Sequence, residues 1–173
     1  MILRPFHLED ARGLYELNND PEVIKYTGDP PFHDLGDAKK FILNYDHYER
    51  WGHGRYSVLL SGNNTFLGWC GLKWNPEINE LDLGFRFMKK HWGNGYATES
   101  SKACLYQAYS QLGYQNIIGR VMCPNPASIR VLQRLGFKFE KYISCEKAIS
   151  EQWRHTSRKG STPDNSNKFG DRE

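Results

Sequence analysis

Alternating apolar residues predict strands near the middle of the chain. From Leu81 to Phe87 every second residue is large and apolar, which is typical of a strand with one buried face. Two further strands are predicted at 55–60 and 65–74, joined by a Ser-Gly-Asn-Asn turn at 61–64. Because the three runs follow one another closely, we expect an antiparallel meander.

Apolar residues at helical spacing predict five helices, at 7–17, 20–24, 34–48, 97–112 and 125–135. Asp-Pro and Asn-Pro pairs begin two of them, since Asp and Asn cap helix N-termini and Pro is tolerated in the first turn. The small residues on the fourth helix indicate close packing against the sheet.

Short strands at 2–4, 117–122 and 137–145 complete the pattern. The main elements then follow the order β-α-α-β-β-β-α-β-α-β, which indicates one α/β domain over residues 1–154. The segment 155–173 has one aromatic residue and little else that is apolar, so we expect a flexible polar tail.

Composition narrows the class of protein. With 173 residues and 39% apolar content the chain can bury a sizeable core. The net charge of +3 is mild and the charges are mixed, so nothing demands nucleic acid. No apolar run is long enough for a signal peptide or a membrane span. Four scattered cysteines without a C-x-x-C pair predict free thiols and no metal site, and we expect a cytoplasmic protein.

The strand ending at Phe87 runs into a basic, glycine-rich turn, Lys89-Lys90-His91-Trp92-Gly-Asn-Gly, and then into a helix. Glycines let the backbone approach a ligand, and the N–H groups of a helix N-terminus attract negative charge. The turn therefore predicts an anion site, and Lys89 or Lys90 could add positive charge.

Two of three known glycine loops do not fit this turn. The phosphate loop G-x-x-x-x-G-K-[ST] is absent, and the dinucleotide fingerprint fails because Thr98 replaces its last glycine. The third is the acetyl-CoA loop of the GNAT N-acetyltransferases. The string WGNGYATES at 92–100 resembles the W-G-x-G-[YF]-A-T-E form of the RimJ/RimL-like branch.

Four other strings resemble the same branch: L-R-P-F-x-x-x-D-A at 3–11, N-D-P-E-V at 19–23, L-G-W-C-G-L at 67–72, and the N-x-x-S…L-G-F run at 125–137. The resemblance implies the GNAT fold, with a mostly antiparallel sheet, helices on both faces and a cleft where the fourth and fifth strands splay. It also implies direct transfer of acetyl from acetyl-CoA to the primary amine of a protein or peptide N-terminus or of a small molecule. Relatives often form homodimers, although no sequence feature here fixes the oligomeric state.

The resemblance further implies a set of cofactor contacts. Main-chain amides of the turn would bind the pyrophosphate, and those at 87–88 would polarise the thioester. The residues expected to contact acetyl-CoA are Phe87, Met88, Trp92, Gly93, Asn94, Gly95, Tyr96, Ala97, Thr98, Asn125 and Ser128. Asn125 and Ser128 could equally form an ordinary helix cap.

Catalytic groups are harder to place. Relatives use a carboxylate on the fourth strand as general base, and Asp82 and Glu80 lie two apart on one strand face. Both could instead be solvent-facing, and a neutral amine needs no base. The tyrosine acid of many relatives is replaced by Leu132, and in the RimJ/RimL-like branch a serine, here Ser128, is the proposed substitute. A thiolate leaving group with a pKa near ~8.5 needs little help.

The acceptor is not readable from the sequence. Trp51, Tyr56, Trp69 and Trp74 either line an acceptor cleft or belong to the core. The loop at 26–35 carries no motif. A second interpretation is a non-catalytic module that binds acyl-CoA as a sensor or scaffold, which would bind acetyl-CoA without releasing CoA.

Overall fold

The computed structural model describes residues 1–145 and 148–157. Its seven strands form one sheet in the order β1-β2-β3-β4-β5-β7-β6, in which only β4 and β5 are parallel neighbours. The strands are β1 (Ile2–Arg4), β2 (Arg55–Leu59), β3 (Phe66–Asn75), β4 (Glu80–Phe87), β5 (Asn116–Met122), β6 (Lys138–Cys145) and β7 (Ala148–Thr156). The predicted meander is confirmed as β2–β3–β4.

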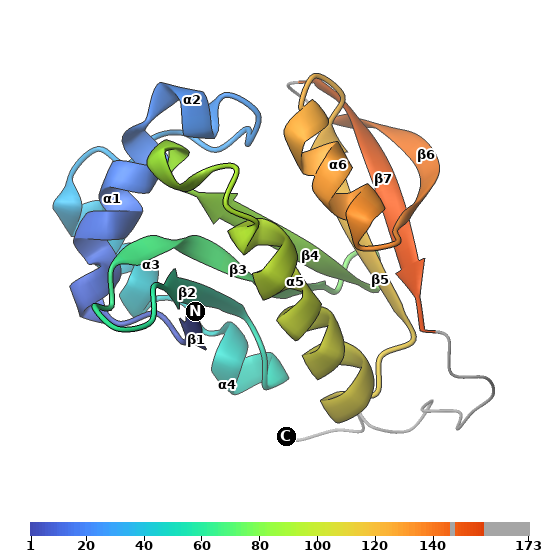
Figure 1. The fold of residues 1–173 in the computed structure, drawn as a ribbon, viewed down its shortest axis with the longest axis horizontal. Coiled ribbons are helices and arrows are strands. Elements are labelled where there is room, and N and C mark those ends of the chain that lie inside the picture. The colour runs from blue at the N-terminus through green and yellow to red at the C-terminus, as the bar shows by residue number, and fades with distance from the viewer. Residues whose placement is uncertain (146–147, 158–173) are drawn as a thin grey trace.

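Helices cover both faces of this sheet (Figure 1). They are α1 (Ala11–Asn19), α2 (Pro21–Ile24), α3 (Leu35–Leu43), α4 (His47–Trp51), α5 (Tyr96–Tyr106) and α6 (Pro126–Arg134), with short 3-10 turns at Leu8–Asp10 and Lys89–His91 and a π turn at Gln107–Gln111. The two predicted caps are confirmed. Asp20 accepts a hydrogen bond from the Glu22 N–H, and Asn125 accepts one from the Ser128 N–H.

Two apolar clusters hold the layers together. The larger cluster packs α5 and α6 against one sheet face around Leu72, Leu83 and Ile117. The smaller cluster packs α1–α3 against the other face around Leu14 and Trp69. The small residues of α5 allow the close approach predicted from the sequence, since Cys104 lies with its Sγ 3.8 Å from that of Cys70. Both thiols are free and buried, whereas the side chain of Cys145 lies outside the described part.

The long helix predicted from 34 to 48 is wrong, because α3 ends at Leu43 and α4 begins at His47. Two tyrosine hydroxyls explain the break. Tyr45 accepts a hydrogen bond from the Arg55 N–H at 2.7 Å, and the Tyr48 hydroxyl donates to the Arg55 carbonyl oxygen. These contacts fix the segment between the two helices to the start of β2.

Strand β7 was not predicted, and it lies between β5 and β6. Its sequence, AISEQWRHT, has little apolar alternation, because its polar side chains pair with neighbouring strands. Arg154 binds both Glu80 of β4 and Glu140 of β6, and Gln152 also donates to Glu140. The strand reaches Thr156, two residues beyond the expected domain end, and most of the predicted tail lies at 158–173, outside the described residues.

Strands β4 and β5 diverge at one end of the sheet. In the described chain the two strands are paired at a single position, Asp82 opposite Ile118, although β4 continues to Phe87 and β5 to Met122. Figure 1 shows α2 and α6 on opposite sides of this open end. Within residues 1–145 and 148–157, no helix has the length and apolar character needed to cross a lipid bilayer.

Candidate active site

The open end of the sheet leads into a cavity of about 880 Å³ that passes between β4 and β5. Side chains alternate along β4, so Leu83, Phe85 and Phe87 face α5 and α6 whereas Asp82 and Arg86 face the N-terminal helices. We call the part of the pocket on the α5 and α6 side of the sheet the α6 half, and it includes the glycine loop at 92–98. The part on the side of the N-terminal helices is the α2 half. One pocket therefore opens on both faces of the sheet.

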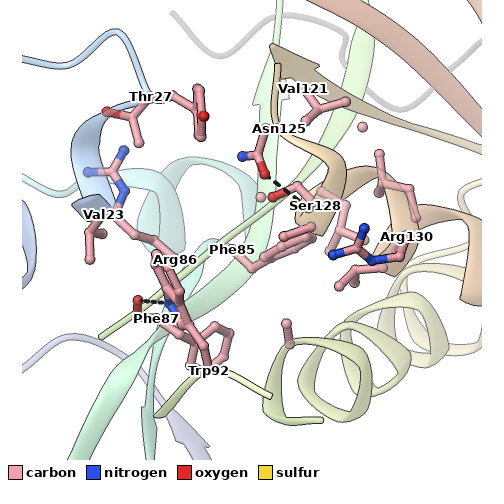
Figure 2. Close-up of a pocket in the computed structure, with 18 of the residues that line it drawn as sticks. Val23, Thr27, Phe85, Arg86, Phe87, Trp92, Val121, Asn125, Ser128 and Arg130 are labelled. Carbon is pink, nitrogen blue, oxygen red and sulfur yellow. Dashed lines mark hydrogen bonds between the residues drawn. The ribbon is translucent and has the colours of Figure 1, made fainter. Parts of the chain in front are cut away.

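Opposite ends of the chain supply the two walls. Figure 2 shows Val23, Thr27 and Arg86 along one wall and Asn125 and Ser128 along the other. Segments more than a hundred residues apart in sequence thus face each other only because the sheet brings α2 and α6 to the same edge.

The glycine loop forms a backbone cradle in the α6 half. Gly93 and Gly95 both have φ near +81°, and a Cβ at either position would meet no atom within 4 Å. Gly95 is the N-cap of α5, and because it has no side chain, the first N–H groups of that helix, at Tyr96, Ala97 and Thr98, are left uncapped beside the pocket. The arrangement can bind an anion through main-chain donors and the helix N-terminus.

Two predicted loop residues support the cradle from within. The Trp92 N–H donates to the Lys89 carbonyl oxygen at 3.1 Å, so this amide is already used. The Asn94 side chain donates to the carbonyl oxygens of His91 and Trp92 at 3.1 and 3.2 Å and lies outside the pocket lining. Asn94 therefore fixes the shape of the turn.

Main-chain groups of β4 also face the pocket. The Met88 N–H donates to the Leu67 carbonyl oxygen at 3.0 Å, so the expectation that the Met88 amide is unpaired is wrong. In an antiparallel ladder this bond leaves Phe87, opposite Gly68, with its N–H and C=O directed away from β3. Its carbonyl accepts the Trp92 indole N–H at 2.7 Å. The Phe87 N–H therefore points into the gap between β4 and β5.

The α6 wall combines a helix cap with positive charge. Asn125 Oδ1 accepts the Ser128 N–H at 3.1 Å, and both side chains line the pocket. Arg130 and Arg134 line it too, whereas Lys89 and Lys90 are exposed outside it. These arginines were not predicted as site residues from the sequence, although their spacing of four places them on one face of the helix.

The two candidate carboxylates have different surroundings. Asp82 lines the pocket and accepts hydrogen bonds from Arg120 at 3.0 and 3.2 Å. Burial raises the pKa of Asp82 above 3.8, although Arg120 and Arg55 act in the opposite direction. Glu80 lies outside the pocket lining and is held by two hydrogen bonds from Arg154 at 2.7 and 3.1 Å. The structure thus brings Asp82, and not Glu80, to the pocket.

Of the four aromatic residues considered for an acceptor cleft, Trp69 lines the pocket. Trp51 and Trp74 pack against each other with tilted rings whose centroids are 6.0 Å apart, and Tyr56 lies against Tyr48. Trp69 contacts the guanidinium groups of Arg55 in β2 and Arg86 in β4. These arginines carried no recognisable motif in the sequence.

The pocket fits a coenzyme A thioester. Its α6 half offers uncapped N–H groups, open space above two glycines and two arginines for the phosphates. The β4 edge offers a main-chain donor for the thioester end. In the described part of the chain no group of three His, Cys, Asp or Glu side chains is arranged to hold a metal ion.

Comparison with known proteins identifies the family. The model of the acetyltransferase (GNAT) domain matches residues 1–138. The uncharacterized N-acetyltransferase p20 of Bacillus licheniformis is 30% identical over 81% of this chain and 80% of its own length. Spermidine N(1)-acetyltransferase of Escherichia coli K12 is 26% identical over 90% of this chain and 82% of its own.

A solved structure agrees with this assignment at the level of the fold. Spermidine N-acetyltransferase from Vibrio cholerae, in complex with CoA and spermine, superposes with a TM-score of 0.75 at 18% identity, covering 90% of this chain and 94% of that one. The predicted α/β fold with its splayed β4–β5 pair is confirmed. From the family match and the pocket together, the chain belongs to the GNAT family of acetyltransferases.

Proposed function

We propose that this enzyme transfers an acetyl group from acetyl-CoA directly to a primary amine, as a RimJ/RimL-like member of the family. The acceptor would be a peptide N-terminus or a small amine. One observation carries the proposal: a single cavity joins the glycine cradle to a partly buried carboxylate, Asp82, through the gap between β4 and β5. The spermidine acetyltransferases among the relatives support an amine as acceptor.

Acetyl-CoA supplies an activated acetyl thioester. The N–H groups at 95–98 and the guanidinium groups of Arg130 and Arg134 would bind its phosphates. The side-chain amide of Asn125, which lines the pocket, would bind the pantetheine arm. The Phe87 N–H would stabilise negative charge that develops on the thioester oxygen, because it faces the gap and lies in a buried strand.

Two side chains would assist the reaction, one by accepting a proton and one by donating a hydrogen bond. Asp82 would accept the proton of the incoming amine, directly or through water, since its raised pKa makes it a better base than an ordinary aspartate. The Ser128 hydroxyl, on the opposite wall, would donate a hydrogen bond to the departing thiolate. Glu80 takes no part in this scheme, because Arg154 occupies both of its oxygens.

Two measurements test the proposal. Calorimetry should detect binding of acetyl-CoA, and a thiol reagent should detect steady release of CoA when alanyl or seryl peptides, polyamines or amino sugars are added. Release that depends on one acceptor class supports the enzyme. Tight binding of acetyl-CoA with no release above hydrolysis for any acceptor would instead support a sensor, and no binding would overturn both.

A further inference from the structure

Positive side chains dominate the α2 half of the pocket, where the acceptor would lie. The cations on this side are Lys25, Arg55, Lys73, Arg86 and Arg120, and the carboxylates are Glu22, Asp29 and Asp82. Arg120 is bound to Asp82 and Arg86 to Asp29. Within the described chain, Arg55 and Lys73 have no carboxylate partner.

Arg55 is fixed in place at both its main chain and its guanidinium group. Tyr45 and Tyr48 hold both the N–H and the carbonyl of its main chain. Its guanidinium stacks on Trp69 at 4.4 Å from the ring centroid, while Arg86 contacts the same ring at 5.4 Å. A side chain held in this way loses little entropy when it binds a ligand.

One polar atom of Arg55 is left without a partner. Its Nε is buried and makes no hydrogen bond to any described residue. A buried donor that stays unpaired costs roughly 1–3 kcal/mol, so such a group usually has a ligand or water as its partner. Planar guanidinium groups recognise carboxylates and phosphates through paired N–H donors.

The position of Arg55 places an anion close to the reacting amine. A Cβ on Gly84 would lie 3.5 Å from Arg55 Nη2 and 3.3 Å from the Trp69 ring. Because glycine has no Cβ, the space beside the guanidinium group is open to a ligand. Gly84 is two residues from Asp82 on the same face of β4, a step of about 7 Å.

From these contacts we infer that the acceptor is an amine that also carries a carboxylate or phosphate, bound by Arg55 with support from Lys73. The inference rests on the proposed acetyl transfer and names its substrate class. A polycation such as spermidine would instead meet five positive side chains in this half of the pocket.

The test uses acceptor pairs that differ only in the anionic group. We would compare 4-aminobutyrate with butylamine, O-phosphoethanolamine with ethanolamine, and the C-terminally amidated peptide Ser-Asp-Gly with amidated Ser-Asn-Gly, and add spermidine alone. The anionic member of at least one pair should have a kcat/KM about tenfold higher or more, the size expected of one charge-assisted contact. The pair that responds distinguishes a carboxylate from a phosphate.

Variants assign the effect to Arg55. Arg55→Gln should bring the ratio of kcat/KM between the anionic member and its neutral twin close to one, whatever it does to the rate common to both, and Arg55→Lys should restore part of the preference. Arg12→Gln is the matched control, because Arg12 is exposed on α1 and, among the described residues, its ion pair is with Glu16 alone. Thermal melting of each variant checks that it folds.

A binding measurement works without turnover. The CoA-loaded protein, whose glycine cradle is then filled, is titrated with inorganic phosphate and with butyrate by calorimetry. Binding that is lost in Arg55→Gln and kept in Arg12→Gln supports the inference. Equal or better rates with neutral amines or spermidine would overturn it, as would absent binding of both anions. Failure of CoA to bind at all would overturn the proposed function instead.

Discussion

The two halves of the pocket are built on different principles. In the α6 half, the groups that a ligand could reach come mainly from the main chain, the N–H groups at 93–98 and of Phe87, whose positions depend on two glycines and one helix start. In the α2 half they come from charged side chains, Asp82, Arg55 and Arg120, on three different strands.

The difference separates what is common to a family from what is particular to one chain. A backbone cradle recognises a constant ligand, since any residue supplies an N–H group and only the conformation matters. A set of side chains from separate strands can change with single substitutions while the sheet stays the same. We therefore expect the α6 half to recognise the cofactor and the α2 half to recognise the acceptor.

Replacing a carboxylate in the α2 half should give the largest effect. Asp82→Asn should lower kcat by about 100-fold, the low end for loss of a general base. In the parent enzyme kcat should fall as pH drops through the pKa of Asp82, and because burial raises that pKa, this fall should occur above pH 3.8. A pH profile of kcat measures both effects.

Glu80→Gln is the matched control, two residues away on the same strand face. It weakens the Arg154 pair and should cost ~1–2 kcal/mol in the free energy of unfolding, with kcat nearly unchanged. Equal losses of kcat in the two variants would mean that Asp82 acts through structure rather than as a base.

Adding a methyl group to the glycine cradle should weaken cofactor binding in the α6 half without changing acceptor binding in the α2 half. Gly95→Ala should raise the KM for acetyl-CoA by about tenfold, because the new Cβ fills the space by which the backbone approaches the diphosphate. Gly113→Ala has the same left-handed backbone, with φ of +76°, and lies outside the pocket lining.

Both glycine variants should lose ~1–2 kcal/mol of unfolding free energy. Only Gly95→Ala should change acetyl-CoA affinity, and neither should alter the preference among acceptors. A shift in acceptor preference with Gly95→Ala would show that the two halves are not independent.

The smallest effect is expected for Ser128→Ala. Loss of one hydroxyl donor should lower kcat by about three- to tenfold, since a thiolate is a good leaving group and one hydrogen bond contributes about 0.5–1.5 kcal/mol. The cap should survive, because it uses the Ser128 N–H and not its side chain. An unchanged kcat in a single-turnover experiment would remove Ser128 from the scheme.

Prediction from sequence failed where a segment depends on distant partners. Strand β7 lacks apolar alternation because Arg154 and Gln152 are satisfied by Glu80 and Glu140 on other strands. The helix from 34 to 48 breaks because Tyr45 and Tyr48 bond to Arg55. In both cases tertiary hydrogen bonds override a local pattern.

The sequence by itself determined the meander, the two caps and the glycine turn before α5. These features depend on residues within a few positions of one another, where periodicity and backbone conformation act directly. It also placed Asp82 on a polar strand face, but gave no means to separate it from Glu80.

Only the tertiary structure decided which groups meet in the pocket. The divergence of β4 from β5 turned the Phe87 N–H toward the gap, and pairing with β3 removed the Met88 N–H from consideration. The sheet also brought Arg55 and Asp82 together from strands far apart in sequence. Such contacts depend on strand order and register, which patterns of neighbouring residues in the sequence do not specify.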